Sequence, residues 1–236
     1  GLNRKLIGCL LGAIILGITC YIDDVKDIKP LVKLAGQVIA AIVVVSSGVL
    51  IDNFTIPFKE NNVMLNEVFS FVLTVGWIVG ITNAINLIDG LDGLAAGISS
   101  IYFITIGIVI VGWKHTFGLD AVITFIMLGA TLGFLCHNFN PAKIFMGDTG
   151  SLMLGGAVAG MALYLKMPLL LLIIALVPVI ETISVIIQVR YFKKTGNRIF
   201  KMTPIHHHFE LSGWNENKIV SVFSIITLAL CIIGLI

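Results

Sequence analysis

Apolar residues in this chain are gathered into long continuous runs that short polar segments separate. A helix needs roughly 20 apolar residues to cross a bilayer, and about eight runs of that kind are present. They lie at residues 4–22, 31–51, 68–86, 93–113, 119–137, 150–166, 168–189 and 219–236. Apolar and polar positions do not alternate within them, so helices are favoured over the strands of a barrel. The pattern predicts an all-α, polytopic membrane helix bundle.

Composition supports the same conclusion. Hydrophobic residues make up 58% of the chain and charged residues only 12%, whereas soluble domains carry about 25% charged residues. The net charge of +2 is too small to indicate a nucleic-acid partner, so the lipid bilayer is the predicted environment. No linker or shift in composition divides the chain. Residues 1–236 are therefore expected to form a single domain.

The polar segments after every second run share one face of the predicted bundle, because consecutive helices cross in opposite directions. These segments are residues 23–30, 87–92, 138–149 and 190–218. The basic residues on or next to this face are Lys26, Lys29, Lys33, Lys143, Arg190, Lys193, Lys194, Arg198, Lys201 and Lys218. Those assigned to the other face are Arg4, Lys5, Lys59, Lys114 and Lys166. The positive-inside rule predicts that the first face is cytoplasmic and that both termini lie outside.

Acidic residues are concentrated on that same face. Residues 23–27 read Asp-Asp-Val-Lys-Asp, residues 83–97 include Asp-Gly-Leu-Asp-Gly, and residues 147–151 read Gly-Asp-Thr-Gly-Ser. Carboxylates are hard oxygen ligands that suit Mg²⁺ or Mn²⁺, and glycine lets a backbone come close to a phosphate or metal. Any single aspartate could equally be a solvated helix cap. Taken together, the three acidic loops predict convergence on one magnesium site.

Further polar residues stand out against the apolar background. Phe145 could stack on a nucleobase while Asn138 hydrogen-bonds its edge, or both could pack the loop that carries them. His206–His208 are consecutive, so one is expected to reach a metal or phosphate while the others position the substrate or the loop. Glu181 and Gln188 lie seven residues apart on one helical face of an apolar run. Polar groups inside a membrane are costly and often functional.

In their order and spacing, Asp23-Asp24 and residues 83–94, 138–151 and 206–208 resemble the motifs of the polyprenyl-phosphate N-acetylhexosamine-1-phosphate transferases. The resemblance covers essentially the whole chain. Family members carry two further helices before the first run, so this chain is expected to lack them.

Two branches of that family are in question. Residues 147–214, with the histidine loop, look like the phospho-N-acetylmuramoyl-pentapeptide transferases. Residues 80–89, together with Asp27, look closer to the undecaprenyl-phosphate N-acetylglucosamine-1-phosphate transferases. The histidine loop weighs more, because the branches differ there in the region expected to recognise the sugar.

The resemblance implies a magnesium-dependent phosphoryl transfer, in which undecaprenyl phosphate attacks the β-phosphorus of a UDP-N-acetyl sugar and UMP leaves. UDP-N-acetylmuramoyl-pentapeptide is the favoured donor, and UDP-N-acetylglucosamine is the alternative. The implied catalytic residues are Asp23, Asp24, Asp148 and His206, and the implied ligands of Mg²⁺ (or Mn²⁺) are Asp148 and Asp24. The resemblance also implies the substrate-binding residues. Asn138, Phe145, Gly90, Leu91 and Asp92 would form the uridine pocket, and Asp89 and Asn86 would support it. Gln188, His207 and His208, together with His206, would meet the sugar side. The implied location is the bacterial inner membrane, and the oligomeric state stays open, a homodimer included.

An ion-coupled transporter and a noncatalytic scaffold are the competing interpretations. A transporter places its working charges near the bilayer midplane, whereas here nearly all acids lie in loops on one face. A scaffold would not explain three acidic motifs on the same side. The pattern therefore favours an enzyme that works at the membrane interface.

Overall fold

The protein is described here by a computed structural model, which covers residues 3–55, 62–113, 115 and 117–236. Its helices are α1 (Arg4–Lys26), α2 (Pro30–Ser46), α3 (Glu67–Leu87), α4 (Leu94–Ile108), α5 (Leu119–Asn138), α6 (Gly147–Tyr164), α7 (Pro168–Ile174), α8 (Leu176–Thr195), α9 (Ile205–Glu210) and α10 (Glu216–Leu235). A π-helical turn, Val109–Trp113, continues α4. Strands β1 (Asn53–Thr55) and β2 (Asn62–Met64) form an antiparallel hairpin in which Asn53 lies opposite Met64.

Each apolar run of the sequence forms helix, so the all-α membrane fold is confirmed. Within the described residues, five helices are long and apolar enough to cross a membrane, and six if α7 and α8 form one span. The run 168–189 is broken, because α7 and α8 meet at an angle of 75°. The remaining runs form α2, which is shorter, and α6, which begins with polar residues. The number of spans, about eight by the apolar runs, stays a prediction.

Local sequence explains where several helices begin. Asn3, Asn66 and Asn215 precede α1, α3 and α10, and each side chain accepts a backbone N–H from the first turn of its helix. A side-chain oxygen at this position satisfies a donor that the helix itself leaves unpaired. Pro30 and Pro168 stand at the first positions of α2 and α7, where a missing N–H costs nothing.

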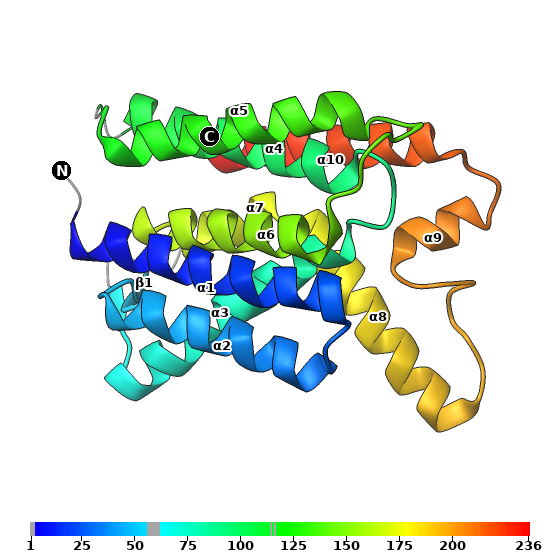
Figure 1. The fold of residues 1–236 in the computed structure, drawn as a ribbon, viewed down its shortest axis with the longest axis horizontal. Helices are drawn as coiled ribbons and strands as arrows, with labels where there is room; N and C mark the ends of the chain where they lie inside the picture. The colour runs from blue at the N-terminus through cyan, green and yellow to red at the C-terminus, as the bar shows by residue number, and fades with distance from the viewer. Residues whose placement is uncertain (1–2, 56–61, 114, 116) are drawn as a thin grey trace.

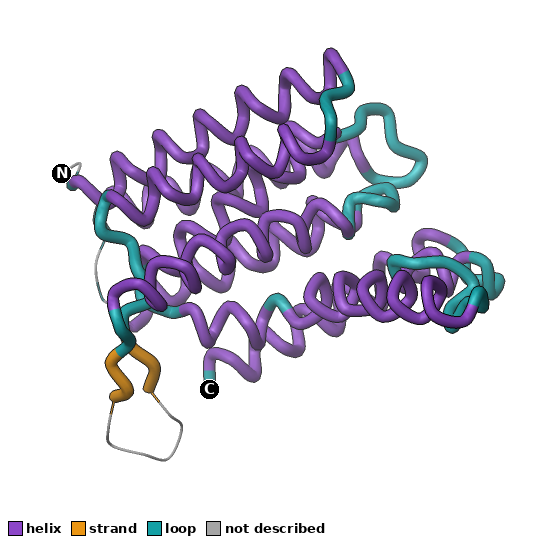
Figure 2. The backbone as a smooth tube through the Cα atoms, turned by 90° about the horizontal axis from the view of Figure 1, so that it is seen from below, coloured by secondary structure: helices purple, strands orange, loops and turns teal. Residues whose placement is uncertain are grey.

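The segments that carry the motifs gather at one end of the bundle. Figure 1 shows the connections after α1, α3 and α5 and the α8–α10 segment at this end, with the N-terminus and the β hairpin at the other. Figure 2 shows the same separation after a quarter turn. The predicted sharing of one face by these segments is therefore confirmed. Which side of the membrane the face occupies stays a prediction, and Lys59 and Lys114, two of the residues assigned to the other face, lie outside the described residues.

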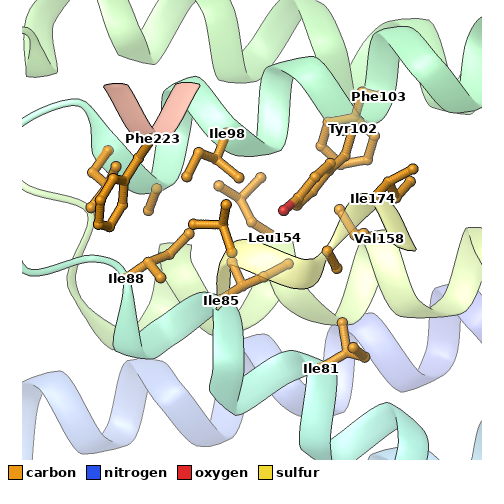
Figure 3. Close-up of a cluster of buried hydrophobic side chains, with 14 of the residues drawn as sticks. Ile81, Ile85, Ile88, Ile98, Tyr102, Phe103, Leu154, Val158, Ile174 and Phe223 are labelled. Carbon is orange, nitrogen blue, oxygen red and sulfur yellow. The ribbon is translucent and has the colours of Figure 1, made fainter. Parts of the chain in front are cut away.

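α6 is the helix against which α1 and α3 pack. A Cβ added at Gly155 of α6 would lie 2.7 Å from the Thr82 Cα of α3, so glycine is what permits this close approach. The largest buried cluster lies between α3, α4, α6, α7 and α10, with Ile85, Ile98, Tyr102 and Val158 among its members (Figure 3). This core holds α3, α4 and α6 together just below the turn that carries Asp89 and Asp92.

Candidate active site

Charged side chains meet where the ends of α1, α2 and α6 come together. α1 ends at Lys26, and the left-handed backbone of the next residue, Asp27 (φ 49°), turns the chain away from the helix axis. The Asp23 carboxylate in the last turn of α1 lies 3.1 Å from the Lys33 ammonium of α2, and the same ammonium pairs with Asp148 of α6. Asp23, Lys33 and Asp148 are called the lysine cluster below. It joins two of the acidic motifs through one cation.

Lys33 was not among the predicted site residues; the sequence analysis used it only as a positive charge. The sequence did contain a feature that could have identified Lys33, because this lysine stands at the start of an apolar run. A lysine in such a position is costly unless a carboxylate pairs with it. The sequence alone could not show which carboxylate that would be.

The second acidic motif reaches the lysine cluster through Asn86 of α3. Its amide nitrogen donates to Asp148 Oδ1 and to Ser151 Oγ, both at 2.8 Å. The Ser151 hydroxyl donates in turn to the Gly147 carbonyl. Both oxygens of the Asp148 carboxylate therefore have donors, one from Asn86 and one from Lys33.

Asp24 caps the N-terminus of α6 from a distant part of the chain. Its carboxylate accepts the backbone N–H groups of Asp148 and Thr149 at 3.1 and 3.0 Å and the Thr149 hydroxyl at 2.5 Å. A carboxylate is favoured at a helix N-terminus, where unpaired N–H groups carry partial positive charge. Gly147 adopts φ +62°, and a Cβ there would lie 3.1 Å from Asp24 Oδ2, so both the backbone and this cap favour glycine.

The residues at this end suit a divalent cation held by few protein ligands. Among the described residues, no group of three His, Cys, Asp or Glu side chains lies close enough to hold a metal by itself. Asp23 and Asp148 nevertheless direct carboxylate oxygens at one ammonium, and the Asp24 carboxylate lies next to the Asp148 backbone, whose N–H it accepts. Magnesium usually takes one or two carboxylates and completes its shell with water and substrate phosphate. The predicted pair Asp148 and Asp24 is compatible with that kind of site.

A pocket of about 280 Å³ opens beside the lysine cluster. One wall comes from the turn between α3 and α4, and the other from the segment between α5 and α6. The lining residues are Asn86, Asp89, Gly90, Leu91, Asp92, Asn138, Phe145, Met146, Gly147 and Asp148. The structure therefore brings all the residues assigned to a nucleotide pocket together with the predicted metal ligand Asp148.

Asn138 and Phe145 behave differently within this pocket. Asn138 is 4% exposed; its oxygen accepts the Gly93 N–H at 3.0 Å, and its amide donates to the Ile144 carbonyl at 2.9 Å. These bonds favour the loop-packing alternative for Asn138. Phe145 is 78% exposed, which leaves its ring available for stacking.

Asp92 fastens the two walls of the pocket to each other. Its Oδ2 accepts the Ala142 N–H at 2.8 Å and an Asn140 amide hydrogen at 3.2 Å. Glu216 of α10 accepts the Asp92 N–H at 2.5 Å with Oε1 and the Asn140 amide at 2.6 Å with Oε2. Asp92, Asn140 and Glu216 are called the clamp below. Sequence reasoning missed Glu216, which there resembles any acidic residue at a helix start.

Asp89 lines the same pocket without such bonds. Burial raises the pKa of Asp89 to about 7, because removing its carboxyl from water disfavours the ionised form. No hydrogen bond from another described residue to this carboxylate is found that would offset the burial. Two aspartates three residues apart in one motif thus have different environments.

The histidine loop forms α9 and packs against the turn at Gly90. A Cβ on Gly90 would lie 2.5 Å from His206 Nε2 and 3.2 Å from His207 Nε2. His206 is completely buried, and its backbone N–H donates to Glu181 Oε1 at 3.1 Å. Its ring Nδ1 lies 3.4 Å from the same oxygen, and neither ring nitrogen makes a hydrogen bond within the described residues. His207 Nδ1 contacts Glu210 Oε2 at 2.9 Å.

Gln188 and His208 hold the basic loop that precedes α9. The Gln188 oxygen accepts the N–H groups of Ile199 and Phe200 at 3.0 and 3.1 Å, and its nitrogen donates to the Phe200 carbonyl at 3.0 Å. His208 Nδ1 accepts the Lys201 N–H at 3.1 Å. Neither residue lines the pocket. Their predicted contact with a sugar stays a prediction, and the structure gives both a part in ordering the loop.

Comparison with known proteins places these features in a family. The pattern of glycosyl transferase family 4 matches residues 6–166. A phospho-N-acetylmuramoyl-pentapeptide-transferase of Clostridium botulinum (strain Eklund 17B / Type B) is 54% identical over 181 residues, which are 77% of this chain and 55% of the relative. Proteins of the same name from Staphylococcus carnosus and Clostridium acetobutylicum are 54% and 51% identical, each over 76% of this chain and 55% and 56% of the relative. The chain spans about half the length of the curated relatives it matches.

Proposed function

Because the chain belongs to glycosyl transferase family 4, we propose that it transfers phospho-N-acetylmuramoyl-pentapeptide from its UDP conjugate to undecaprenyl phosphate. An oxygen of the lipid phosphate would bond to the β-phosphorus, and the bond from that phosphorus to UMP would break. The products are a lipid pyrophosphate-linked sugar and UMP. The observation that carries the proposal is the pocket, whose walls join the predicted nucleotide residues to the lysine cluster.

The nucleotide would occupy the pocket between its two walls. Phe145 would stack on the uracil, because its ring is exposed at the pocket and aromatic faces bind bases without needing a particular edge. The turn with Gly90, Leu91 and Asp92 would form the opposite side. Asp89 and Asn86 would support the ribose and phosphate end, where the pocket reaches Asp148.

The diphosphate would lie next to the lysine cluster. Asp148 and Asp24 would hold Mg²⁺, or Mn²⁺, which when bound neutralises phosphate charge and aligns the reacting groups. Lys33 would move from the carboxylates to an incoming phosphate, since its ammonium binds only side-chain oxygens here. Asp23 would position the lipid phosphate. Each carboxylate oxygen can accept more than one contact, so the cap that Asp24 forms does not prevent metal binding.

The histidine loop would contribute to the sugar side. His206 and His207 lie against Gly90, which lines the pocket, but neither histidine lines it and His206 is completely buried. His207 would contact the substrate after a small shift of this loop, and the catalytic role of His206 would require the same shift. Gln188 and His208 would act on the sugar through the basic loop that they hold.

The donor is proposed to be UDP-N-acetylmuramoyl-pentapeptide, because curated relatives at 50–54% identity carry that name. The reaction would take place at the bacterial inner membrane, with the pocket facing the cytoplasm, as the basic residues on that face favour. Residues 1–236 would form one transferase domain.

Replacing Asp148 by Asn tests this proposal. The assay is magnesium-dependent UMP release by detergent-solubilised protein with undecaprenyl phosphate and either UDP-N-acetylmuramoyl-pentapeptide or UDP-N-acetylglucosamine. We expect turnover with the pentapeptide donor only, and a loss of at least about 100-fold in Asp148→Asn, since an isosteric amide cannot neutralise a cation. Asp27→Asn is the matched control, because Asp27 is an exposed aspartate whose left-handed backbone asparagine tolerates.

Each result has a defined meaning. Turnover only with UDP-N-acetylglucosamine would show that the first half of the chain was the better guide to the donor. Unchanged turnover in Asp148→Asn would remove Asp148 from the metal site, and absence of UMP release with both donors would contradict the proposed reaction.

A further inference from the structure

We infer that Glu216 is a positioning residue that sets the width of the nucleotide pocket by holding its two walls in register. The inference rests on the proposed function for the identity of the ligand, a uridine nucleotide, but its geometry is independent of that function. Glu216 lies outside the pocket lining and belongs to the first turn of α10. Its effect on a ligand would therefore be indirect.

The two oxygens of the Glu216 carboxylate are used for different walls. Oε1 accepts the backbone N–H of Asp92, in the turn between α3 and α4, and Oε2 accepts the side-chain amide of Asn140, in the segment between α5 and α6. These contacts span 124 and 76 residues of sequence. A single side chain thus connects three separate parts of the chain.

A carboxylate is suited to this position because both partners are donors. An ionised carboxylate accepts at both oxygens, whereas a glutamine amide accepts at one end and donates at the other. Glu216→Gln therefore keeps one of the two hydrogen bonds. At the other, the glutamine NH₂ group would face a second donor, so no bond can form there. Glu216→Ala leaves both donors without this partner. The inference predicts a graded effect, in which alanine is worse than glutamine.

Other bonds between the walls would remain after this change. Asn138 still accepts the Gly93 N–H, and the Asp92 carboxylate still accepts the Ala142 N–H. The walls should consequently stay close, but the turn that carries Asp92 would lose its tie to α10. We expect a pocket that is still present and less well ordered.

The competing explanation is that Glu216 only stabilises the start of α10, as any acidic residue in a first turn does. Asn215→Ala separates the two explanations. Asn215 is the N-cap of the same helix, and its side chain accepts the Lys218 N–H at 2.8 Å, but it takes no part in the clamp. Loss of this cap should weaken the helix start to a similar degree and leave the walls joined.

The first readout is UMP binding to purified, detergent-solubilised protein by titration calorimetry in the presence of Mg²⁺. We expect about tenfold weaker binding in Glu216→Ala, the loss typical of one hydrogen bond to a charged group, and a smaller loss in Glu216→Gln. Asn215→Ala should bind UMP within about twofold of wild type. In turnover, KM for the UDP-sugar should rise while kcat stays near wild type, which marks the loss of binding that substrate and transition state share.

The second readout is hydrogen exchange of residues 88–93 and 140–146. Both segments should exchange faster in Glu216→Ala and at the wild-type rate in Asn215→Ala. Equal UMP affinity in Glu216→Ala and wild type, or an equal loss in Asn215→Ala, would overturn the inference. If wild type turns over neither UDP-sugar while UMP binding and exchange change as expected, the proposed reaction fails and the role of Glu216 stands.

Discussion

The lysine cluster and the clamp lie at the same end of the molecule and are built from similar residues, yet their hydrogen bonds differ in kind. In the lysine cluster, Asp23 and Asp148 share the ammonium of one flexible side chain. In the clamp, Asp92 and Glu216 accept backbone N–H groups of Ala142 and Asp92 and the amide of Asn140. In the first arrangement the cation is a mobile side chain that could turn toward a ligand, whereas in the second two of the donors are backbone N–H groups, which cannot.

This difference indicates separate roles for the two groups of residues, one in binding a ligand and one in fixing the pocket. A lysine has a long stem and three donors that rotate freely, so it can follow a phosphate. A backbone N–H is fixed by the fold, and leaving it buried and unpaired costs about 1–3 kcal/mol. The lysine cluster is thus suited to contacting a reacting phosphate, and the clamp is suited to keeping the pocket walls in place. Asp89 belongs to neither group and carries the raised pKa.

The largest expected effect comes from breaking the lysine cluster. Lys33→Met removes the cation between Asp23 and Asp148 and keeps most of the apolar stem. We expect UMP release to fall at least about 100-fold, because a positioned charge at a transferring phosphate is lost. Lys26→Met, at an exposed lysine near the end of α1, should keep activity. Turnover of Lys33→Met within a few-fold of wild type would mean that this cluster is only structural.

A smaller effect is expected where the histidine loop meets the turn that carries Asp89. Gly90→Ala places a Cβ 2.5 Å from His206 Nε2, and the buried His206 ring has little room to shift. Overpacking of this kind costs about 1–3 kcal/mol. Thermal unfolding in detergent should show a lower midpoint than wild type.

Gly76→Ala provides the control for that change. Apart from its chain neighbours and the local helix backbone, no atom of the described residues lies within 4 Å of a Cβ at Gly76, which stands inside α3. Alanine there should be neutral or stabilising, since it is the better helix former. If Gly90→Ala unfolds at the wild-type temperature, the close packing of the histidine loop on Gly90 is not present in solution.

The smallest expected effect is a pH dependence due to Asp89. Burial raises its pKa to about 7 in the folded protein from an ordinary value of 3.8. The folded state therefore holds this proton more tightly than the unfolded state, so its contribution to stability is full below about pH 4 and is lost as the pH rises to about 7. After allowance for partial solvent access, the change should be about 1–2 kcal/mol.

Asp89→Asn should remove that dependence. We expect the unfolding midpoint of wild type to fall relative to the variant between about pH 4 and pH 7, and to run parallel to it above that range. A constant difference across the range would show that Asp89 is ionised in the folded protein with its ordinary pKa.

Particular residues show how far sequence reasoning reached. The apolar runs predicted every long helix, because burial in lipid requires continuous apolar surface whatever the tertiary arrangement. They did not predict the bend between α7 and α8, because the apolar run 168–189 is continuous in sequence. The residues expected to form or support the uridine pocket, from Asn86 to Phe145, line a single pocket, and nucleotide binding there stays a prediction. Lys33 and Glu216 were missed, because an ordinary basic or acidic residue shows its role only through a partner far away in the chain.

The sequence by itself determined that this is a helical membrane protein with its acidic motifs at one end, since hydrophobic length and the alternation of crossing directions suffice for that. The tertiary structure decided that Asp23 and Asp148 pair with Lys33, that Asp92 joins the two pocket walls, and that Asp89 is partly buried with a raised pKa. These four aspartates differ in environment because their partners come from other parts of the chain. Hydrogen-bond donors, burial and nearby charge are properties of the folded site, and they set the chemistry of each carboxylate.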